Sequence, residues 1–158
     1  MTVYIVQTGL ANIASVQAAF ERLGQTVELT DDPNRVEDAD RVVLPGVGAF
    51  GPGMAQLRRH GLLEPLRRRI DDERPTLAIC LGMQLLAKTS EESPGIRGLG
   101  CFDADVTAFP ASVNTPQFGW NGVTPSDGAS MLGEGGFVYF ANAYRIVDAP
   151  AGWGAAQA

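Results

Sequence analysis

Residues 76–86 of the chain, TLAICLGMQLL, set a cysteine where a short apolar run stops and a helix-like run begins. The run 76–80 has the length and composition of a strand buried in a parallel sheet. Ala78 and Gly82 stand two residues before and two residues after Cys80, and small residues there suit a tight strand-to-helix turn around a nucleophile. Such a turn exposes the sulfur and aims it at a helix N-terminus, which favours the thiolate. A buried structural cysteine at a strand end is the alternative.

The segments before this stretch alternate between strand-like and helix-like patterns. Short apolar runs at 3–6, 26–30 and 41–45 predict three further strands. Between the first two runs, Asn12 can cap a helix that ends near Gly24. The apolar residues of this segment recur at helical spacing: Ile13, Val16, Phe20 and Leu23.

Helical material is also expected from Met54 to about Ile70, after the glycine-rich loop 46–53, whereas the polar segment 31–40 is expected to be a turn-rich connection. Strands that alternate with helices predict a parallel sheet, because the crossover helices must cover it. We therefore expect a doubly wound, largely parallel α/β fold with helices on both faces, and residues 1–158 in one domain.

Past Lys88 the patterns weaken. Residues 101–109 alternate like a strand with one wet face, and the runs 136–141 and 144–147 predict a hairpin or two further strands.

The charge and the cysteine content exclude several functions. A net charge of −6 argues against a nucleic-acid or membrane surface, because phosphates require clustered Lys and Arg. The basic run 67–69 is followed at once by acidic residues and fits a solvated helix face. Neither a signal peptide nor a membrane span is predicted, so we expect a cytoplasmic protein. Cys80 and Cys101 are then expected to stay reduced, and no residue spacing suggests a metal or another cofactor.

A second glycine loop, LPGVGAFG at 44–51, follows the expected third strand and contains the spacing G-x-G-x-x-G. This spacing permits a dinucleotide site, in which a pyrophosphate rests on a helix N-terminus. That fingerprint normally follows the first strand of its unit, however, and here the next strand ends in Cys80. A loop with free N–H groups beside a nucleophile suggests acyl transfer instead.

These two stretches together resemble the class I glutamine amidotransferases, and among them the glutaminase subunits of imidazole glycerol phosphate synthase, which act in histidine biosynthesis. The resemblance is carried by LPGVGAFGPGM at 44–54 and PTLAICLGMQLL at 75–86. Further stretches agree with it along the whole chain: GLANIASVQAAF at 9–20, SEE at 90–92 followed by GLG at 98–100, and PQFGWNGV at 116–123.

The resemblance implies a reaction and residues that perform it. Cys80 would attack the side-chain carboxamide of glutamine, release ammonia and form a glutamyl thioester, which water then hydrolyses. Val47 and Leu81 would donate backbone N–H groups to the oxyanion. The glutamine itself would be held by Gly48 and Gln84, with Tyr144 beside it.

The resemblance also implies a partner and no cofactor. Ammonia would pass to a cyclase subunit with a (β/α)₈ barrel, with which the chain would form a heterodimer. Three positions match those that face the cyclase subunit in the family: Asn12, Trp120 and Asn121.

Several features depart from the family pattern. The family completes its catalytic triad with a His and a Glu in a C-terminal HPE segment, which the 158 residues do not contain, so we expect this form to be truncated and inactive. The only histidine, His60, fits a helix end or the surface. The family commonly has His-Ser-Tyr where this chain has Asn142-Ala143-Tyr144, and a His where Gln117 stands.

Three hypotheses therefore remain open from the sequence. The chain is a glutaminase subunit, a non-catalytic relative that acts as a binding module, or a nucleotide-binding α/β protein that uses the loop Gly46–Gly51.

Overall fold

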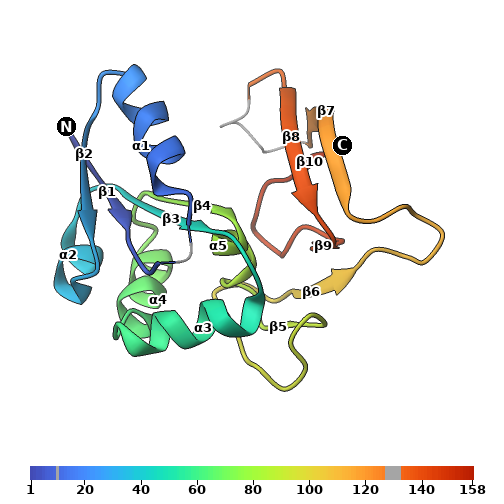
Figure 1. The fold of residues 1–158 in the computed structure, drawn as a ribbon, viewed down its shortest axis with the longest axis horizontal. Coiled ribbons are helices and arrows are strands. Elements are labelled where there is room, and N and C mark those ends of the chain that lie inside the picture. The colour runs from blue at the N-terminus through green and yellow to red at the C-terminus, as the bar shows by residue number, and fades with distance from the viewer. Residues whose placement is uncertain (10, 127–132) are drawn as a thin grey trace.

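The first half of the molecule is built on a parallel sheet. The computed structural model describes residues 1–9, 11–126 and 133–158 (Figure 1); Leu10, in the stretch GLANIASVQAAF, lies outside them. The sheet has four parallel strands in the order β2-β1-β3-β4, as a doubly wound fold requires. All four predicted strands are confirmed, as β1 (Thr2–Val6), β2 (Thr26–Thr30), β3 (Val42–Gly46) and β4 (Thr76–Cys80).

Helices cover both faces of this sheet, as predicted. On one face, the side chains of α1 (Ile13–Arg22) pack against Val3, Ile5 and Val43. On the other face, the alternate strand residues pack with α2 (Pro33–Asp38), α3 (Phe50–Arg59) and α4 (Leu63–Asp71). In Figure 1, α1 lies above the sheet and α3 and α4 lie below it. Strand β3 is buried at every position because its side chains alternate between two covered faces, whereas the edge strands β2 and β4 are partly exposed.

The expectation of a turn-rich connection at 31–40 is wrong, because α2 lies there. The Asp32 carboxylate caps this helix by accepting a hydrogen bond of 3.0 Å from the Asn34 N–H, and Pro33 occupies its first turn. Val36 is fully buried beneath it. One buried residue and a good cap are enough for a short helix packed on a sheet, although they leave almost no periodic signal in the sequence.

The helical segment expected from Met54 to Ile70 has different limits. Helix α3 already begins at Phe50, and a break at Gly61, which has φ of 69°, separates it from α4. Gly53 lies inside α3, where a Cβ would stand only 3.0 Å from the Leu85 side chain. Glycines in this loop therefore serve close packing as well as turning.

The helix after Cys80 is much shorter than its sequence suggests. Helix α5 spans only Leu81–Gln84, and the chain continues in turns in which the Leu86 and Ala87 N–H groups bond to the Met83 and Gln84 carbonyls. The helix N-terminus expected behind the thiol is present, but its dipole is weak because one turn aligns few peptide groups.

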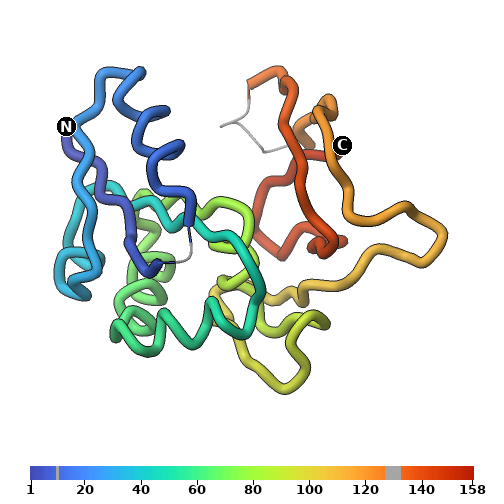
Figure 2. The backbone as a smooth tube through the Cα atoms, in the orientation of Figure 1, coloured from blue at the N-terminus to red at the C-terminus, as the bar shows by residue number. Residues whose placement is uncertain are grey.

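The last third of the chain forms two small sheets. The order β5-β6-β9 joins Thr89–Ser90, Asp105–Ala108 and Tyr144–Arg145, and the order β10-β7-β8 joins Ala156–Gln157, Gln117–Pro125 and Gly136–Asn142. The expected strands exist, but β8 does not pair with β9. Instead β8 pairs with β7, and β9 pairs with β6. Figure 2 shows the chain running out from α5 through β6 to the β7–β8 hairpin and returning beside β7. Among the described residues, no helix is long and apolar enough to cross a membrane.

Candidate active site

Cys80 occupies a strained turn between β4 and α5. Its φ of 53° and ψ of −115° lie in a region that residues other than glycine rarely adopt. Such a conformation costs on the order of 1–3 kcal/mol and persists only where the surroundings impose it. The side chain is exposed. The predicted strand-to-helix turn is confirmed, and the alternative of a buried structural cysteine is wrong.

Two glycines allow this turn to contact strand β3 closely, because they have no side chain. A Cβ at Gly82 would stand 2.0 Å from the Leu44 carbonyl oxygen, and one at Gly46 would stand 2.7 Å from the Gly82 nitrogen. Both distances are far below contact, so neither position accepts a side chain without displacing the backbone. Gly46 is also the register partner of Cys80 between the two parallel strands. The predicted proximity of the glycine loop and the thiol follows directly from that register.

The loop after Gly46 supplies backbone groups beside the thiol. Val47 is exposed, and Gly48 adopts φ of 99° with open space around it. Leu81 is buried and follows Cys80 directly. The two peptide groups predicted to bind the oxyanion, those of Val47 and Leu81, thus follow neighbouring strand ends. Their role in stabilising an oxyanion stays a prediction.

Gln84 and Tyr144 meet in the structure, although 60 residues separate them. The Gln84 side-chain amide donates a hydrogen bond of 3.3 Å to the Tyr144 carbonyl, and Asn142 donates one of 3.1 Å to the same oxygen. Strand β9 is thereby held against α5. Asn142, which stands where the family commonly has His, is used here to fix the backbone, and its Oδ1 atom is buried without a partner among the described residues. The contact of Gln84 and Tyr144 with glutamine stays a prediction.

The three residues predicted to face a partner lie on two parts of the molecule. Asn12 is exposed at the N-cap position of α1, but its side chain makes no capping hydrogen bond, so its expected capping role is wrong. Trp120 and Asn121 lie on β7, and consecutive strand residues point to opposite faces. Trp120 is 70% exposed and stacks edge-to-face on Tyr139 at 5.6 Å. Tyr139 could not be predicted from the sequence, because only the strand register pairs it with Trp120.

His60 lies far from the thiol. It caps the end of α3, and its Nδ1 atom is 3.6 Å from the Asp31 carboxylate, just after β2. Strands β1 and β3 separate β2 from β4, which corresponds to about 14 Å at the usual strand spacing. The interpretation of His60 as a helix-end residue is confirmed.

The second thiol has a different environment. Cys101 is half-buried, and burial, helped by the negative charge of Asp71, raises its pKa to about 11. It borders a cavity of about 960 Å³ at the amino-terminal ends of β3 and β4, opposite to the edge that carries Cys80. Among the described residues, no group of three or more His, Cys, Asp or Glu side chains is arranged to hold a metal ion.

Two residues that the sequence analysis did not single out hold the start of α3. The Glu92 carboxylate accepts a hydrogen bond of 2.7 Å from the Phe50 N–H, and the Ser93 hydroxyl accepts one of 2.9 Å from the Gly51 N–H. The nucleotide interpretation requires these same donors for a phosphate. Because they are occupied, and a carboxylate supplies a negative charge there, the geometry disfavours a nucleotide at the loop Gly46–Gly51.

Comparisons with known proteins agree with this geometry. Residues 4–115 match the family model of the CobB/CobQ-like glutamine amidotransferase domain. A crystal structure of a glutamine amidotransferase superposes with a TM-score of 0.72, covering 94% of this chain and 76% of the other, at 20% identity. The chain thus has the fold of the class I glutamine amidotransferases and belongs to this class.

Sequence relatives define the family more narrowly. Imidazole glycerol phosphate synthase subunit HisH of Moorella thermoacetica is 44% identical over 146 residues, which are 90% of this chain and 70% of that protein. The subunit of the same name in Methanopyrus kandleri is 43% identical, over 92% of this chain and 72% of its own length. The chain therefore belongs to the HisH family of glutamine amidotransferases.

Proposed function

We propose that this chain acts as the glutaminase subunit of an imidazole glycerol phosphate synthase, in the cytoplasm. The observation that supports this most directly is the register of Gly46 with Cys80, because it sets a loop of backbone donors beside an exposed thiol on a strained turn. The names of the relatives support the assignment to imidazole glycerol phosphate synthase, and the exposure of Cys80 supports its thiol as the nucleophile.

In the proposed reaction, the Cys80 sulfur attacks the side-chain carboxamide carbon of glutamine. The carbon–sulfur bond forms, and the negative charge that develops on the carboxamide oxygen is stabilised by the N–H groups of Val47 and Leu81. Collapse of this intermediate breaks the carbon–nitrogen bond, and the nitrogen leaves as ammonia after accepting a proton. Water then hydrolyses the thioester to glutamate and restores the thiol. Gly48, Gln84 and Tyr144 are proposed to hold the substrate.

Both steps need a proton donor or acceptor near the sulfur. The sole imidazole, His60, lies beside Asp31, which follows the edge strand β2. Cys80 ends β4, the strand at the opposite edge of the sheet. We therefore propose that the 158 residues alone can be modified at Cys80 but do not turn over glutamine efficiently.

This part of the proposal is tested by measuring glutamate release over time, with Cys80→Ala as the control. The chain is expected to release no more glutamate than there is protein. Release that survives in Cys80→Ala would exclude the thiol as nucleophile. Sustained release that the substitution abolishes would show that another residue acts as the acid and base.

We further propose that the ammonia passes to a cyclase subunit with a (β/α)₈ barrel. The relatives are named subunits, and in Arabidopsis thaliana the matching region is 25% of a longer protein named imidazole glycerol phosphate synthase hisHF. The proposed contact includes Asn12, Trp120 and Asn121. The stacked pair Trp120 and Tyr139 supports this choice, because exposed aromatic residues are enriched at the centres of interfaces.

Binding to a purified cyclase subunit tests the partner. Trp120→Ala is expected to weaken binding without lowering thermal stability, because the side chain is 70% exposed. Leu23→Ala serves as the control. It removes a similarly exposed apolar side chain, at 73%, from the C-terminal end of α1, whereas Asn12 lies at the N-terminal end. Equal affinity of the two variants would contradict the proposed contact. A cyclase subunit that carries its nucleotide ligand should also accelerate the reaction of Cys80, and an unchanged rate would argue against coupling.

A further inference from the structure

We propose that Glu92 and Ser93 are positioning residues for the acyl-transfer step, because they cap α3 and thereby hold the loop 47–49 beside Cys80. This inference rests on the proposed function, since it assigns a task to residues that do not touch the thiol. It concerns a tertiary contact between segments 42 residues apart.

The first turn of α3 cannot cap itself. A helix begins with N–H groups that have no partner inside the helix, and the residue at the N-cap position normally accepts one of them through its side chain. Here the N-cap residue is Ala49, which has no side-chain acceptor. Glu92 and Ser93 instead accept from the N–H groups of Phe50 and Gly51.

The remaining two positions of this turn, Pro52 and Gly53, leave no N–H group without a partner. Pro52 has no N–H group, and the Gly53 N–H bonds to the Ala49 carbonyl at 3.1 Å. Every donor of the first turn is therefore matched by the protein itself. The bond to Glu92 is also charge-assisted and lies at the positive end of the α3 dipole, which makes it the stronger of the two.

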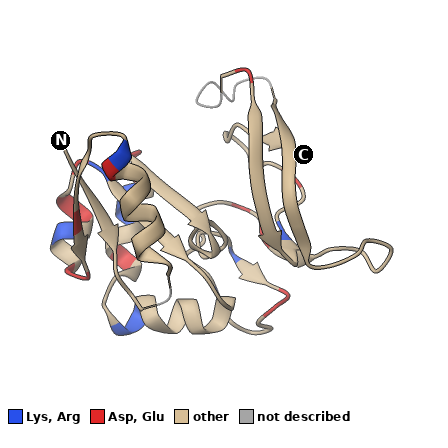
Figure 3. Ribbon diagram, turned by 45° about the horizontal axis from the view of Figure 1, so that its top comes forward, with Lys and Arg blue, Asp and Glu red and all other residues tan. Residues whose placement is uncertain are grey.

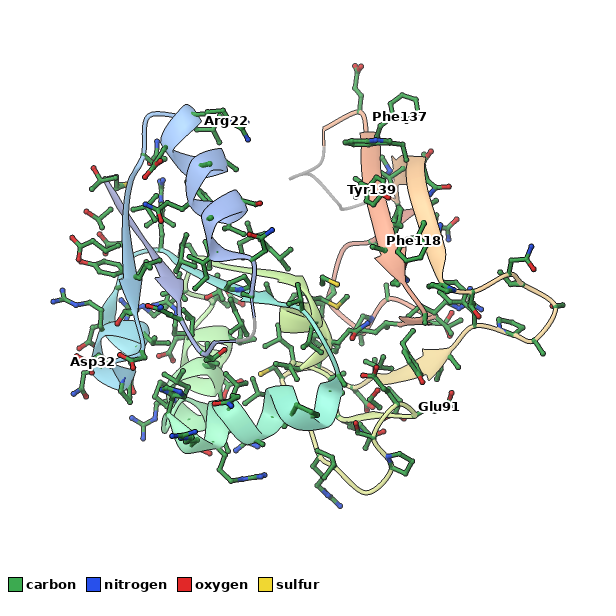
Figure 4. All side chains as sticks on the ribbon, in the orientation of Figure 1. Arg22, Asp32, Glu91, Phe118, Phe137 and Tyr139 are labelled. Carbon is green, nitrogen blue, oxygen red and sulfur yellow. The ribbon has the colours of Figure 1, made fainter. Side chains whose placement is uncertain are left out.

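The capping segment is itself held in place. Ser90 is buried, and its hydroxyl accepts a hydrogen bond of 3.2 Å from the Glu92 N–H, while the Glu91 N–H bonds to the Val106 carbonyl of β6 at 2.9 Å. Figure 1 shows the start of α3 beside β5, and Figure 4 labels Glu91 on the same segment. The cap therefore ties α3 to the sheet that also contains Tyr144.

These contacts leave three residues of the glycine loop between two fixed points. Gly46 packs closely against Gly82 at one end, and the Phe50 N–H donates a hydrogen bond to Glu92 at the other. Among the described residues, none accepts a hydrogen bond from the N–H groups of residues 47–49. The loop has few contacts of its own, so its end points determine the direction of its N–H groups. Removal of the Glu92 cap should let these donors turn away from the thiol.

The experiment compares two alkylation rates of Cys80. A chloromethyl ketone analogue of glutamine reacts when the sulfur attacks its methylene carbon and chloride leaves, and its carbonyl oxygen occupies the place of the glutamine carboxamide oxygen. Iodoacetamide reports thiol reactivity without that site. The ratio of the two rate constants therefore isolates the oriented loop from the reactivity of the sulfur. Glu92→Ala is expected to lower this ratio about tenfold, as the loss of one charge-assisted hydrogen bond would suggest, and Ser93→Ala is expected to lower it by less.

Two further variants complete the experiment. Glu92→Gln retains an oxygen acceptor for the Phe50 N–H and should restore most of the ratio. Glu91→Ala is the matched control, because the Glu91 carboxylate bonds to the Ala108 N–H, away from α3, at 2.8 Å, and it should leave the ratio unchanged. If Glu92→Ala does not fold, Ser93→Ala and Glu92→Gln still measure the effect.

Several results would overturn the inference. Equal ratios for wild type and Glu92→Ala, or for wild type and Ser93→Ala where Glu92→Ala does not fold, would show that the cap only stabilises the fold. A Glu92→Gln variant as impaired as Glu92→Ala would indicate a need for the charge and not for the acceptor. An equal loss in Glu91→Ala would indicate a general disturbance of the segment. Chloroacetone has the same chloromethyl ketone group without the amino-acid part and serves as a reference for the wild type. If the wild type does not react faster with the glutamine analogue than with chloroacetone, the proposed function fails, and the inference fails with it.

Discussion

At the scale of single residues, two glycines determine the turn that exposes Cys80. The cysteine adopts a costly backbone conformation, and Gly46 and Gly82 allow strand β3 to approach closely enough to impose it. Position 82, two residues after the nucleophile, must therefore be glycine, because a Cβ there would overlap the Leu44 carbonyl oxygen. This distance requirement explains why the sequence pattern could predict the turn without any knowledge of the sheet register.

Gly82→Ala should destabilise the protein markedly. The added Cβ would lie 2.0 Å from the Leu44 carbonyl oxygen, and overpacking of this kind typically costs about 1–3 kcal/mol. Urea denaturation measures the loss. Gly136→Ala is the control, because a Cβ there meets nothing within 4 Å. Equal midpoints for the two variants would mean that the turn is not pressed against β3.

The two thiols should differ in reactivity at pH 8. Burial raises the pKa of Cys101 to about 11, so its thiolate is scarce at pH 8 and becomes abundant only as the pH approaches that value. Iodoacetamide at pH 8 should therefore modify the exposed Cys80 well before Cys101, and the rate at Cys101 should keep rising up to about pH 11. Peptide mass spectrometry separates the two sites. Faster labelling of Cys101 at pH 8 would contradict this assignment.

At the scale of elements, a buried arginine joins two helices to the sheet. Arg69 of α4 is fully buried and donates hydrogen bonds to the carbonyls of Val36, Ala39 and Pro75, at 3.0, 2.6 and 2.9 Å. Burial, helped by the positive charge of Arg74, lowers the pKa of Arg69 to about 10, so the guanidinium stays charged at neutral pH. It thus satisfies the C-terminal carbonyls of α2 and the entry to β4 together.

Arg69→Met should cost at least about 2 kcal/mol, because several buried carbonyls lose their donor at once. Arg68→Met is the matched control. Arg68 is exposed and its head group pairs with Glu37, at 2.9 Å, and such a surface pair contributes about 0–1 kcal/mol. The free energy of unfolding of each variant decides between them. A loss in Arg68→Met as large as that in Arg69→Met would show that the buried cap is not important.

The sequence predicted some elements well and others poorly, for physical reasons. The strands of the parallel sheet were clear because each is a short run rich in β-branched or apolar residues, and the central strand β3 is buried at every position. Helix α2 was missed because it is stabilised by its cap and one buried valine, which leave no periodic pattern in the sequence. The sequence predicted a helix after Cys80 but not its end, because the four residues of α5 are followed by turns that depend on tertiary packing. The capping of α3 by Glu92 and the pairing of β8 with β7 depend on tertiary contacts, which periodicity cannot show.

At the scale of the whole molecule, charge is distributed unevenly. The helices of the parallel-sheet part carry many charged residues, whereas strands β7 and β8 carry none (Figure 3). Register places Trp120 opposite Tyr139 and Gly122 opposite Phe137, so the aromatic residues gather on one exposed face of the hairpin. Figure 4 labels three of them, Phe118, Phe137 and Tyr139. An uncharged edge strand with such a face is prone to pair with another chain.

We expect the isolated chain to self-associate at high concentration through this face. Phe137→Glu places a charge on a side chain that is 76% exposed, and it should reduce association without lowering stability. Ser112→Glu adds the same charge to an exposed loop outside the hairpin and should have no such effect. Sedimentation velocity at several concentrations measures the result. Equal association of both variants would place the contact elsewhere.

The central claim is that the strained turn at Cys80 forms a glutamine-specific nucleophilic site. Its most direct test is the site and protection of covalent labelling by the chloromethyl ketone analogue of glutamine, analysed by peptide mass spectrometry. We predict one adduct, on Cys80, whose formation is slowed by free glutamine and not by asparagine, with Cys101 unmodified in the same sample. Labelling of both cysteines at similar rates, or labelling of Cys80 that glutamine does not slow, would contradict the account.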